Sequence, residues 1–406
     1  MKTYQRGEVA MESLNQLYKI GRGPSSSHTM GPERACLRFK EQYDADRFKV
    51  ILYGSLAKTG KGHGTDEVIK RTLELPCEVV FEPEKKDLPH PNTMELFAYK
   101  GERELGRATV LSVGGGRIAW EGDPGQAAPQ VYALNQFAEI AAHCKKNKIR
   151  LWQFAEENEG AALWAHLQTC WNAMKRAVER GLEDEGTLPG GLNVQKKAKY
   201  LFELEHIDES AETRENRMVC SYAFAVSEQN ASGETIVTAP TCGASGVLPA
   251  VLYYQQQKNG YSDDQICRAL ATGGIIGNLI KTNASISGAE CGCQAEIGTA
   301  CAMASAALAE LFGLQLDKIE YAAEIAIEHH LGLTCDPIGG LVQIPCIERN
   351  AVAAMRAINA VSLASFLSST RKISLDKVIV AMKETGRDLR SAYRETSEGG
   401  MAKIEI

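Results

Sequence analysis

The stretch Ala302-Met303-Ala304-Ser305-Ala306-Ala307-Leu308-Ala309 has small, mostly apolar side chains at every position. A helix built from it would present no polar face to water, so other helices must cover it on all sides. The stretch therefore predicts a helical bundle with this helix in its interior.

Helical periodicity extends outward from this stretch. Apolar residues recur at helical spacing in segments 162–182, 214–229, 263–278, 300–312, 318–330, 347–368 and 375–393. Gly- and Pro-rich stretches at 188–191 and 239–243 read as loops between helices. We therefore predict an all-α helical domain over residues 151–406.

The first 150 residues have a different pattern. Runs rich in β-branched and aromatic residues predict strands at 48–53, 78–81, 94–99, 108–111 and 117–120, and helical patterns occur at 33–42 and 66–75. The three glycines 114–116 between two of these strands predict a tight reversal or a bulge. We predict an α/β domain over residues 1–150, and hence an α+β multidomain chain.

Composition excludes several classes of protein. The 406 residues suffice for two domains, and 44% hydrophobic and 24% charged residues are typical of a globular chain. A net charge of −6 gives no long-range positive field for nucleic acid or anionic lipid. No apolar run approaches the roughly 20 residues of a membrane span, and no signal peptide follows Met1. We expect a cytoplasmic protein that binds neither nucleic acid nor membranes.

Twelve cysteines are many for a chain in a reducing compartment. Six of them lie among Gly, Pro and Asp in the last part of the chain, namely Cys242, Cys291, Cys293, Cys301, Cys335 and Cys346. They form no paired Cys-x-x-Cys units, which argues against a zinc ribbon. Spacing alone leaves a metal or iron–sulfur site and a set of buried thiols equally open.

Two further segments concentrate reactive side chains. Ser25, Ser26, Ser27, His28 and Thr29 precede a predicted helix, where hydroxyl and N–H groups either bind an anion or cap the helix. In the segment 60–66, Lys61 is followed by Gly62, which does not fit a phosphate loop.

Histidines are the candidate bases. His63 lies between two glycines, and an imidazole of near-neutral pKa suits proton abstraction. His90, between two prolines, is a weaker candidate of the same kind.

Taken in order, these segments resemble the iron–sulfur-dependent L-serine dehydratases (L-serine ammonia-lyases) over nearly the whole chain. The family-like segments are 23–29, 60–66, 188–192, 238–241, 287–290, 333–337, 345–350 and 394–397. The resemblance implies an N-terminal α/β domain, similar to the allosteric substrate-binding domain of some phosphoglycerate dehydrogenases, and an all-helical catalytic domain.

The resemblance also implies site residues. Cys293, Cys335 and Cys346 would hold a 4Fe-4S cluster, with Cys291 a neighbour and not a ligand. An open iron of the cluster would act as a Lewis acid on the substrate. His63 would take the α-proton of L-serine, and the hydroxyl-rich segment formed by Ser25, Ser26, Ser27, His28 and Thr29 would hold the carboxylate or orient the cluster. Aminoacrylate would leave and become pyruvate and ammonia. We expect a homodimer acting on a small amino acid.

The sequence departs from the family pattern at three places. Cys242 and His330 each stand where Asn is common, and the printed sequence ends in Gly399 to Ile406 without the cysteine that many members place there. We therefore expect no protein thiolate on the open iron. Two alternatives remain: a cysteine desulfidase or a dehydratase of another β-hydroxy amino acid, and a non-catalytic amino-acid-binding regulatory subunit.

Overall fold

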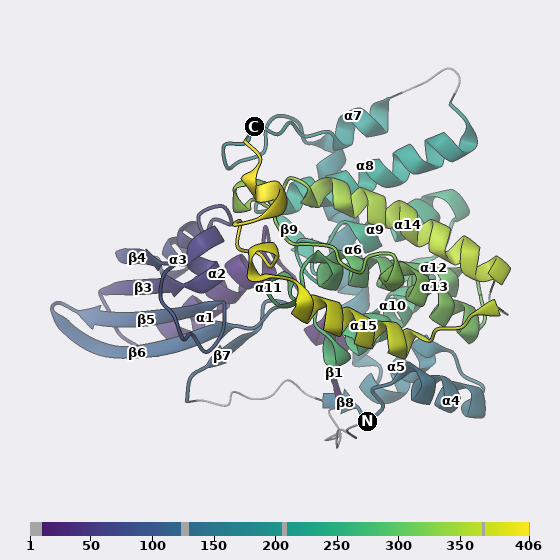
Figure 1. Ribbon diagram of the computed structural model, residues 1–406, viewed down its shortest axis with the longest axis horizontal. Helices are drawn as coiled ribbons and strands as arrows, with labels where there is room; N and C mark the ends of the chain where they lie inside the picture. The colour runs from purple at the N-terminus through teal and green to yellow at the C-terminus, as the bar shows by residue number, and fades with distance from the viewer. Residues whose placement is uncertain (1–9, 123–129, 205–208, 368–369, 406) are drawn as a thin grey trace.

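The computed structural model describes residues 10–122, 130–204, 209–367 and 370–405. A sheet with covering helices forms one side of the molecule and a helical bundle forms the other (Figure 1). The protein is therefore mixed α/β, with its main sheet near the N-terminus and helices in the C-terminal part. The predicted helix end at 368 and the chain ends at 1 and 406 lie outside the described residues.

The sheet has five strands in the order β4-β3-β5-β6-β7. The strands are β3 (Arg47–Tyr53), β4 (Cys77–Glu82), β5 (Thr93–Lys100), β6 (Arg103–Ser112) and β7 (Ile118–Trp120). β3 and β4 run parallel, and the other pairs are antiparallel. Along β3 the buried side chains alternate, with Phe48, Val50 and Leu52 facing the core. The five predicted strands coincide with these within a few residues.

The glycine-rich link between β6 and β7 is a tight reversal, as predicted. Gly114, Gly115 and Gly116 all have positive φ, and Val113 N donates a hydrogen bond to Arg117 O at 3.0 Å.

Three helices accompany the sheet, namely α1 (Gly31–Lys40), α2 (Gly54–Thr59) and α3 (Thr65–Leu73). Phe39 of α1 stacks on Trp120 with ring centroids 6.3 Å apart, and Ile69 of α3 is fully buried in the same core. α1 and α3 each end two residues before the predicted position. At α3 the cause is Glu74, whose left-handed φ of 59° ends the helix.

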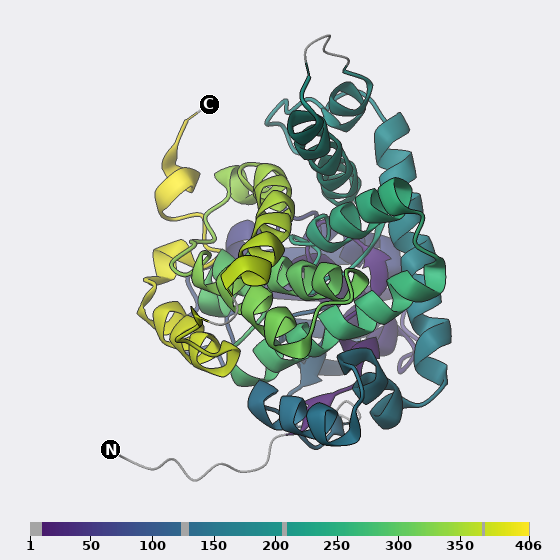
Figure 2. The same cartoon turned by 90° about the vertical axis from the view of Figure 1, so that its right-hand side faces the viewer.

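The helical region consists of α4 (Phe137–Asn147), α5 (Leu151–Glu159), α6 (Ala162–Glu183), α7 (Ala198–Glu203), α8 (Ala211–Ala231), α9 (Val247–Asn259), α10 (Asp263–Asn283), α11 (Gly288–Cys291), α12 (Thr299–Leu311), α13 (Leu316–Glu328), α14 (Cys346–Leu367) and α15 (Leu375–Asp388). α12 packs against α9, α10, α13 and α14. All its residues but Leu311 are buried, which confirms the predicted central helix. Figure 2, seen from the helical side, shows the bundle in front of the sheet region.

Several parts of the helical region differ from the prediction. The helices α4, α5, α7 and α11 were not predicted. α9 was not predicted, because its apolar residues occupy its first half and its polar residues the second, which is not the pattern of one apolar face. The predicted segment 375–393 is helical only to Asp388, and Ser391–Tyr393 form a separate 3-10 turn.

The first described residues belong to the helical core and not to the sheet. β1 (Met11–Glu12) pairs with β8 (Gln130–Tyr132), and β2 (Ile20–Arg22) pairs with β9 (Thr235–Val237). Met11, Leu14 and Tyr18 are buried in the same core as the bundle helices. The chain thus crosses between the two regions more than once. The domain boundary at residue 150 stays a prediction.

Among the described helices, α14 is long and apolar enough to cross a membrane by length and composition. It packs against α8, α9, α12 and α13, which is the environment of a core helix. A single such helix is weak evidence for a membrane span.

Candidate active site

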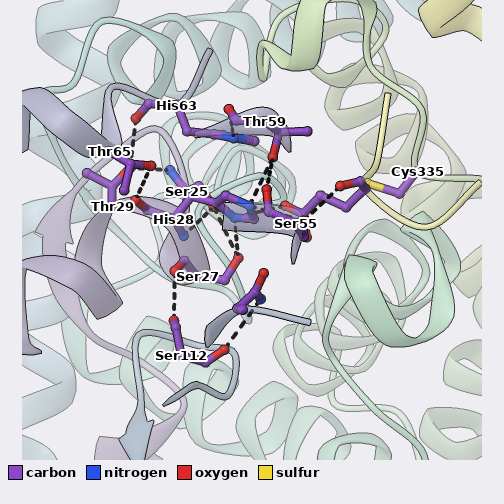
Figure 3. Close-up of polar contacts among 12 residues, drawn as sticks. Ser25, Ser27, His28, Thr29, Ser55, Thr59, His63, Thr65, Ser112 and Cys335 are labelled. Atoms are coloured by element: carbon purple, nitrogen blue, oxygen red, sulfur yellow. Dashed lines mark hydrogen bonds and ion pairs between the residues drawn. The ribbon is translucent and has the colours of Figure 1, made fainter. Parts of the chain in front are cut away.

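Two groups of reactive side chains lie where the sheet region adjoins the helical region. One group comes from the π-helical turn η2 (Ser26–Met30), which runs into α1, and from the segment between α2 and α3 (Figure 3). The other group contains three cysteines of the helical region. The segment after α15, yellow in Figure 1, contacts both groups.

The η2 turn is held by the residue that precedes it. Ser25 is extended, with φ −131°, and its Oγ accepts a hydrogen bond from His28 N at 3.1 Å. Ser25 O accepts from Thr29 N at 2.9 Å. Ser112 of β6 donates to Ser27 O at 2.7 Å, which ties the turn to the sheet. The His28 side chain is therefore fixed relative to the sheet.

The hydrogen bonds of His28 fix its tautomer. Its Nε2 lies 2.9 Å from Thr59 Oγ1 and 3.2 Å from Ser55 Oγ. Thr59 donates its hydroxyl proton to Ser55 O, and Ser55 donates its own to Glu395 O. Both hydroxyls must therefore accept from His28, so Nε2 carries the ring proton and Nδ1 carries the lone pair. Ser27 Oγ lies 3.0 Å from that Nδ1 and can donate to it.

The hydrogen bonds of His63 fix the opposite tautomer. Its Nδ1 lies 2.9 Å from the carbonyl oxygen of Thr59, and a carbonyl can only accept. Nδ1 therefore carries the proton and Nε2 carries the lone pair. Thr29 Oγ1 donates to His63 O at 3.2 Å, and Thr65 Oγ1 donates to His28 O at 2.7 Å. These cross-links hold the two histidine segments together.

The two imidazole rings are neutral partners. Their centroids are 4.4 Å apart, and both side chains are buried. Burial lowers the pKa of His63 to about 4. Burial and the neighbouring His63 ring lower the pKa of His28 well below its usual value. Both rings are therefore unprotonated at neutral pH and hold lone pairs that can accept a proton or bind a cation.

Several hydroxyls of the hydroxyl-rich segment have partners inside the turn itself. Ser25 Oγ and Ser27 Oγ lie 3.3 Å apart beside His28, and Thr29 holds the His63 backbone. Ser26 is buried in the same turn. This arrangement orients the two histidines. Binding of a substrate carboxylate by these residues stays a prediction.

Two of the three predicted cysteine ligands, Cys293 and Cys335, come together with Glu296, and their ligand atoms lie within 4.8 Å of one another. Cys346 is not in that group, although burial and negative charge on Cys293 both raise its pKa. Cys293 follows α11, Cys335 lies in the loop after α13, and Cys346 begins α14. Cys293 Sγ and Cys335 Sγ each lie 4.0 Å from Glu296 Oε2, and all three cysteines are buried. Cys291 instead packs on α15. Its Sγ lies so close to Gly386 of that helix that a Cβ added there would be 2.6 Å away.

The surroundings of the thiols favour a bound cation. A hydrogen bond with the Cys293 thiol, together with burial, raises the pKa of Cys335 well above its usual value. Burial likewise raises the pKa of the Cys346 thiol and of the Glu296 carboxyl. Burial lowers the pKa of the nearby Arg349 guanidinium, but negative charge on Cys293 and Cys346 raises it by more, so the net shift is upward. A cation among these groups would offset the cost of ionising them.

Glu395 joins the two groups. Its Oε1 lies 3.5 Å from His28 Nδ1, and its backbone N donates to Cys335 O at 2.7 Å. Cys335 N in turn donates to Tyr393 O at 2.9 Å. Burial, with Glu296 and Cys293 nearby, raises the pKa of Glu395 well above its usual value. The Glu395 carboxyl is therefore positioned by both the histidines and the cysteine loop.

Several residues of the site were not predicted, namely Ser55, Thr59, Glu296, Arg349 and Glu395. Thr59, Arg349 and Glu395 lie in or beside segments that the sequence marks as unusual, at 60–66, 345–350 and 394–397. Their roles depend on which partners the fold brings near, which spacing does not show. His90, the weaker candidate, has its Nε2 3.9 Å from Glu290 Oε1 and is not a member of the group formed by His28, His63 and Glu395.

A pocket of about 420 Å³ lies beside the thiols. It is formed by the loop after α13 and the first turns of α14, and its lining includes His330, Pro345 and Arg349. Arg349 donates to Thr334 O at 2.7 Å, so its guanidinium is held between the pocket and the cysteine loop. The departure from the family pattern at His330 therefore lies in the wall of this pocket.

Comparisons with known proteins identify the family of the chain. The family model described as serine dehydratase beta chain matches residues 13–76, and that described as serine dehydratase alpha chain matches residues 99–402. The chain is 40% identical to the L-serine dehydratase of Haemophilus influenzae, over 97% of this chain and 99% of the relative. It is 41% identical to L-serine dehydratase TdcG of Escherichia coli, with the same coverage. It is 40% identical to the L-serine dehydratase of Streptomyces coelicolor, over 96% of this chain and 98% of the relative.

Proposed function

The chain belongs to the serine dehydratase family, with the alpha-chain and beta-chain parts in one polypeptide, and from this premise we propose that it converts L-serine to pyruvate and ammonia. The observation that carries the proposal is that Glu395 has its carboxylate within 4.8 Å of a neutral histidine, His63, and its backbone bonded to the buried Cys335. Glu395 connects the two. Elimination of water needs both a base and a group that assists loss of hydroxide, and this site offers a place for each.

We propose that the cofactor is a 4Fe-4S cluster held by Cys293, Cys335 and Cys346. The donor set fits, because thiolates are the ligands that hold iron–sulfur clusters and the raised pKa values of Cys335 and Cys346 make their ionisation depend on a bound cation. When bound, such a cluster supplies an open iron that acts as a Lewis acid on the carboxylate and hydroxyl of the substrate.

His63 is assigned the role of base. Its Nε2 takes the α-proton of serine, and the positive charge that forms on the ring is stabilised by the Nδ1–H bond to Thr59 O. Because burial disfavours the protonated ring, the proton is passed to the departing β-hydroxide, which leaves as water. Loss of the β-hydroxyl gives aminoacrylate, which hydrolyses to pyruvate and ammonia.

The η2 turn is assigned the role of orienting the reactants. Ser25 and Ser27 hold His28 in its tautomer, and Thr29 holds the His63 backbone. Any hydroxyl of this turn that is released on substrate binding could donate to the serine carboxylate. In this proposal the α/β region, 1–150, presents the base, and the helical catalytic domain, 151–406, presents the thiols.

We further propose that the enzyme works in the cytoplasm as a homodimer. All twelve cysteines lie within the described residues and are free thiols, which suits a reducing compartment. A second copy of the chain would bury exposed apolar side chains of α14, such as Leu363 and Phe366.

The test is an anaerobic purification followed by iron and acid-labile sulfide analysis and an assay for pyruvate from L-serine. Bound iron and sulfide with pyruvate formation is the expected result. Sulfide release from L-cysteine in place of pyruvate from serine would assign a desulfidase. Protein without iron or turnover under strict anaerobiosis would contradict the proposal and favour a regulatory subunit.

A further inference from the structure

Three side chains beside the thiols form a second group of potential metal ligands. His28, His63 and Glu395 each place one ligand atom within 4.8 Å of the other two, and all three residues are buried. We propose that they form a binding site for a divalent transition-metal ion of the Zn²⁺ type, separate from the site formed by the cysteines.

The spacing of two of the donor atoms suits one ion, and the ligand atom of His63 lies within 4.8 Å of both. His28 Nδ1 and Glu395 Oε1 lie 3.5 Å apart. Two ligands bound to zinc at roughly 2.1 Å in tetrahedral geometry are about 3.4 Å from each other. An ion can therefore bridge these two atoms with little movement of the ring or the carboxylate, once the Ser27 hydroxyl, 3.0 Å from His28 Nδ1, turns its proton away.

The tautomers of both rings suit metal binding. The proton of His28 is on Nε2, where it bonds Thr59 Oγ1 at 2.9 Å and Ser55 Oγ at 3.2 Å, so the lone pair is on the Nδ1 that faces Glu395. The proton of His63 is on Nδ1, where it bonds Thr59 O at 2.9 Å, so its lone pair is on Nε2. Histidines that bind metals commonly donate their other N–H to an oxygen in this way. Thr59 thus orients both rings, one through its side chain and one through its backbone.

The donor set determines the kind of ion. Two imidazoles and one carboxylate form a set typical of zinc with an open fourth position, whereas Mg²⁺ and Ca²⁺ prefer oxygen ligands alone. The cysteine group is distinct, because it consists of Cys293, Glu296 and Cys335 and shares no member with this one. In cluster-loaded protein the thiolates of the proposed cluster site would already be occupied, so the added Zn²⁺ would be left to the histidines.

Zinc at this site would block the reaction. It would occupy the Nε2 lone pair of His63, and this consequence rests on the proposed function, whereas binding itself does not. We expect Zn²⁺ to inhibit pyruvate formation by the cluster-loaded enzyme, and we expect EDTA to restore it with no loss of iron.

The experiment is equilibrium dialysis of the anaerobically purified, cluster-loaded protein against Zn²⁺, with zinc, iron and sulfide measured on the same samples. We expect Glu395→Gln and His63→Ala to weaken the tight zinc site at least tenfold. Thr59→Val, which removes only the hydroxyl, is expected to weaken it by about 10- to 100-fold. His143→Ala is the matched control, because His143 pairs with Glu157 at the surface, and it should leave zinc binding unchanged.

Several results would overturn the proposal. The first is zinc binding that survives both Glu395→Gln and His63→Ala. The second is zinc uptake matched by loss of iron, which would place the zinc on the thiols. The third is loss of zinc binding in His143→Ala. Zinc bound as expected to a protein that makes no pyruvate from serine would leave this site standing and would contradict only the proposed function. Should a variant fold poorly, Thr59→Val supplies an independent measure, because it keeps all three ligands.

Discussion

The Nδ1 atom of His63 lies 2.9 Å from the carbonyl oxygen of Thr59, and this contact decides which nitrogen of the ring can act as a base. Because a carbonyl only accepts, the proton stays on Nδ1 and the lone pair stays on Nε2. Thr59 belongs to α2 and His63 lies four residues later in the link to α3, so the tautomer is set by a local turn of the α/β region. The reactive nitrogen is thus fixed before any ligand binds.

His63→Ala is therefore expected to lower kcat for pyruvate formation by about 10²- to 10⁴-fold, the usual contribution of a general base. The iron and sulfide contents should equal those of the unmodified protein, because His63 is not one of the proposed ligands of the cluster. His143→Ala, which removes an exposed histidine, is the control and should retain full turnover. Unchanged kcat in His63→Ala with an intact cluster would show that another group removes the proton.

Cys335→Ser is expected to lose bound iron and sulfide. The ligand atoms of Cys335, Cys293 and Glu296 lie within 4.8 Å of one another. Removal of the Cys335 thiol therefore takes away one of the proposed cluster ligands. Cys77→Ser is the matched control, since Cys77 is half-buried on β4 in the sheet region. Iron and sulfide are measured on both variants after anaerobic purification. Full iron content in Cys335→Ser would remove that cysteine from the ligand set.

Ser55→Ala is expected to lower the free energy of unfolding by about 1–3 kcal/mol, because the buried carbonyl oxygen of Glu395 loses its Ser55 donor and His28 Nε2 keeps only Thr59. Ser55 Oγ accepts from His28 Nε2 and donates to Glu395 O at 2.8 Å, so it joins α2 to the C-terminal segment. Urea unfolding measures the change. Ser362→Ala, on the exposed side of α14, is the control and should stay within about 0.5 kcal/mol. Equal stability of both variants would mean that the Ser55 contacts contribute little.

Much of this arrangement follows from the sequence alone. The small apolar residues of α12 identify the interior of the bundle, and the alternation in β3 identifies a strand with one buried face. The cysteines and His63 stand out because their residue types are reactive and glycines or prolines flank them. These features are local, so a single sequence suffices to predict them.

Other parts of the structure depend on contacts between distant segments. Thr59 acts on His63 through a backbone carbonyl, which every residue type possesses, so no sequence pattern marks it. Glu395 is one carboxylate among many until the fold brings it 3.5 Å from His28. Residues 11–22 join the helical core because β1 and β2 pair with β8 and β9, which lie far along the chain. Such pairings require tertiary packing to be known.

Two glycines of α10, Gly273 and Gly277, lie where α10 packs closely against Met303 of α12. A methyl group at Gly273 would lie 2.7 Å from the carbonyl oxygen of Met303, and one at Gly277 would lie 2.7 Å from the sulfur of the same residue. The backbone of α12 cannot yield, whereas the Met303 side chain can change rotamer. We expect Gly273→Ala to lower the free energy of unfolding by about 1–3 kcal/mol despite the better helix propensity of Ala. Gly277→Ala should cost less, and the reverse order in urea unfolding would contradict this packing.

Glu228 is expected to make the stability of the protein depend on pH. Burial raises the pKa of this carboxyl to about 7, although Lys197 N and Ala198 N donate hydrogen bonds to it at 2.6 and 3.3 Å. Between its unfolded pKa of about 4.3 and about pH 7 the folded protein binds more protons than the unfolded one, so this group makes stability fall as pH rises.

Glu228→Gln removes this titration. The stability of the variant relative to the unmodified protein should therefore increase between pH 5 and pH 8, by at most about 3 kcal/mol. Urea unfolding across that range measures the difference. Glu179→Gln, an exposed position on α6, controls for the loss of one charge and should show no such trend. A difference between Glu228→Gln and the unmodified protein that is constant with pH would show that the buried carboxylate stays ionised, stabilised by the two backbone N–H groups.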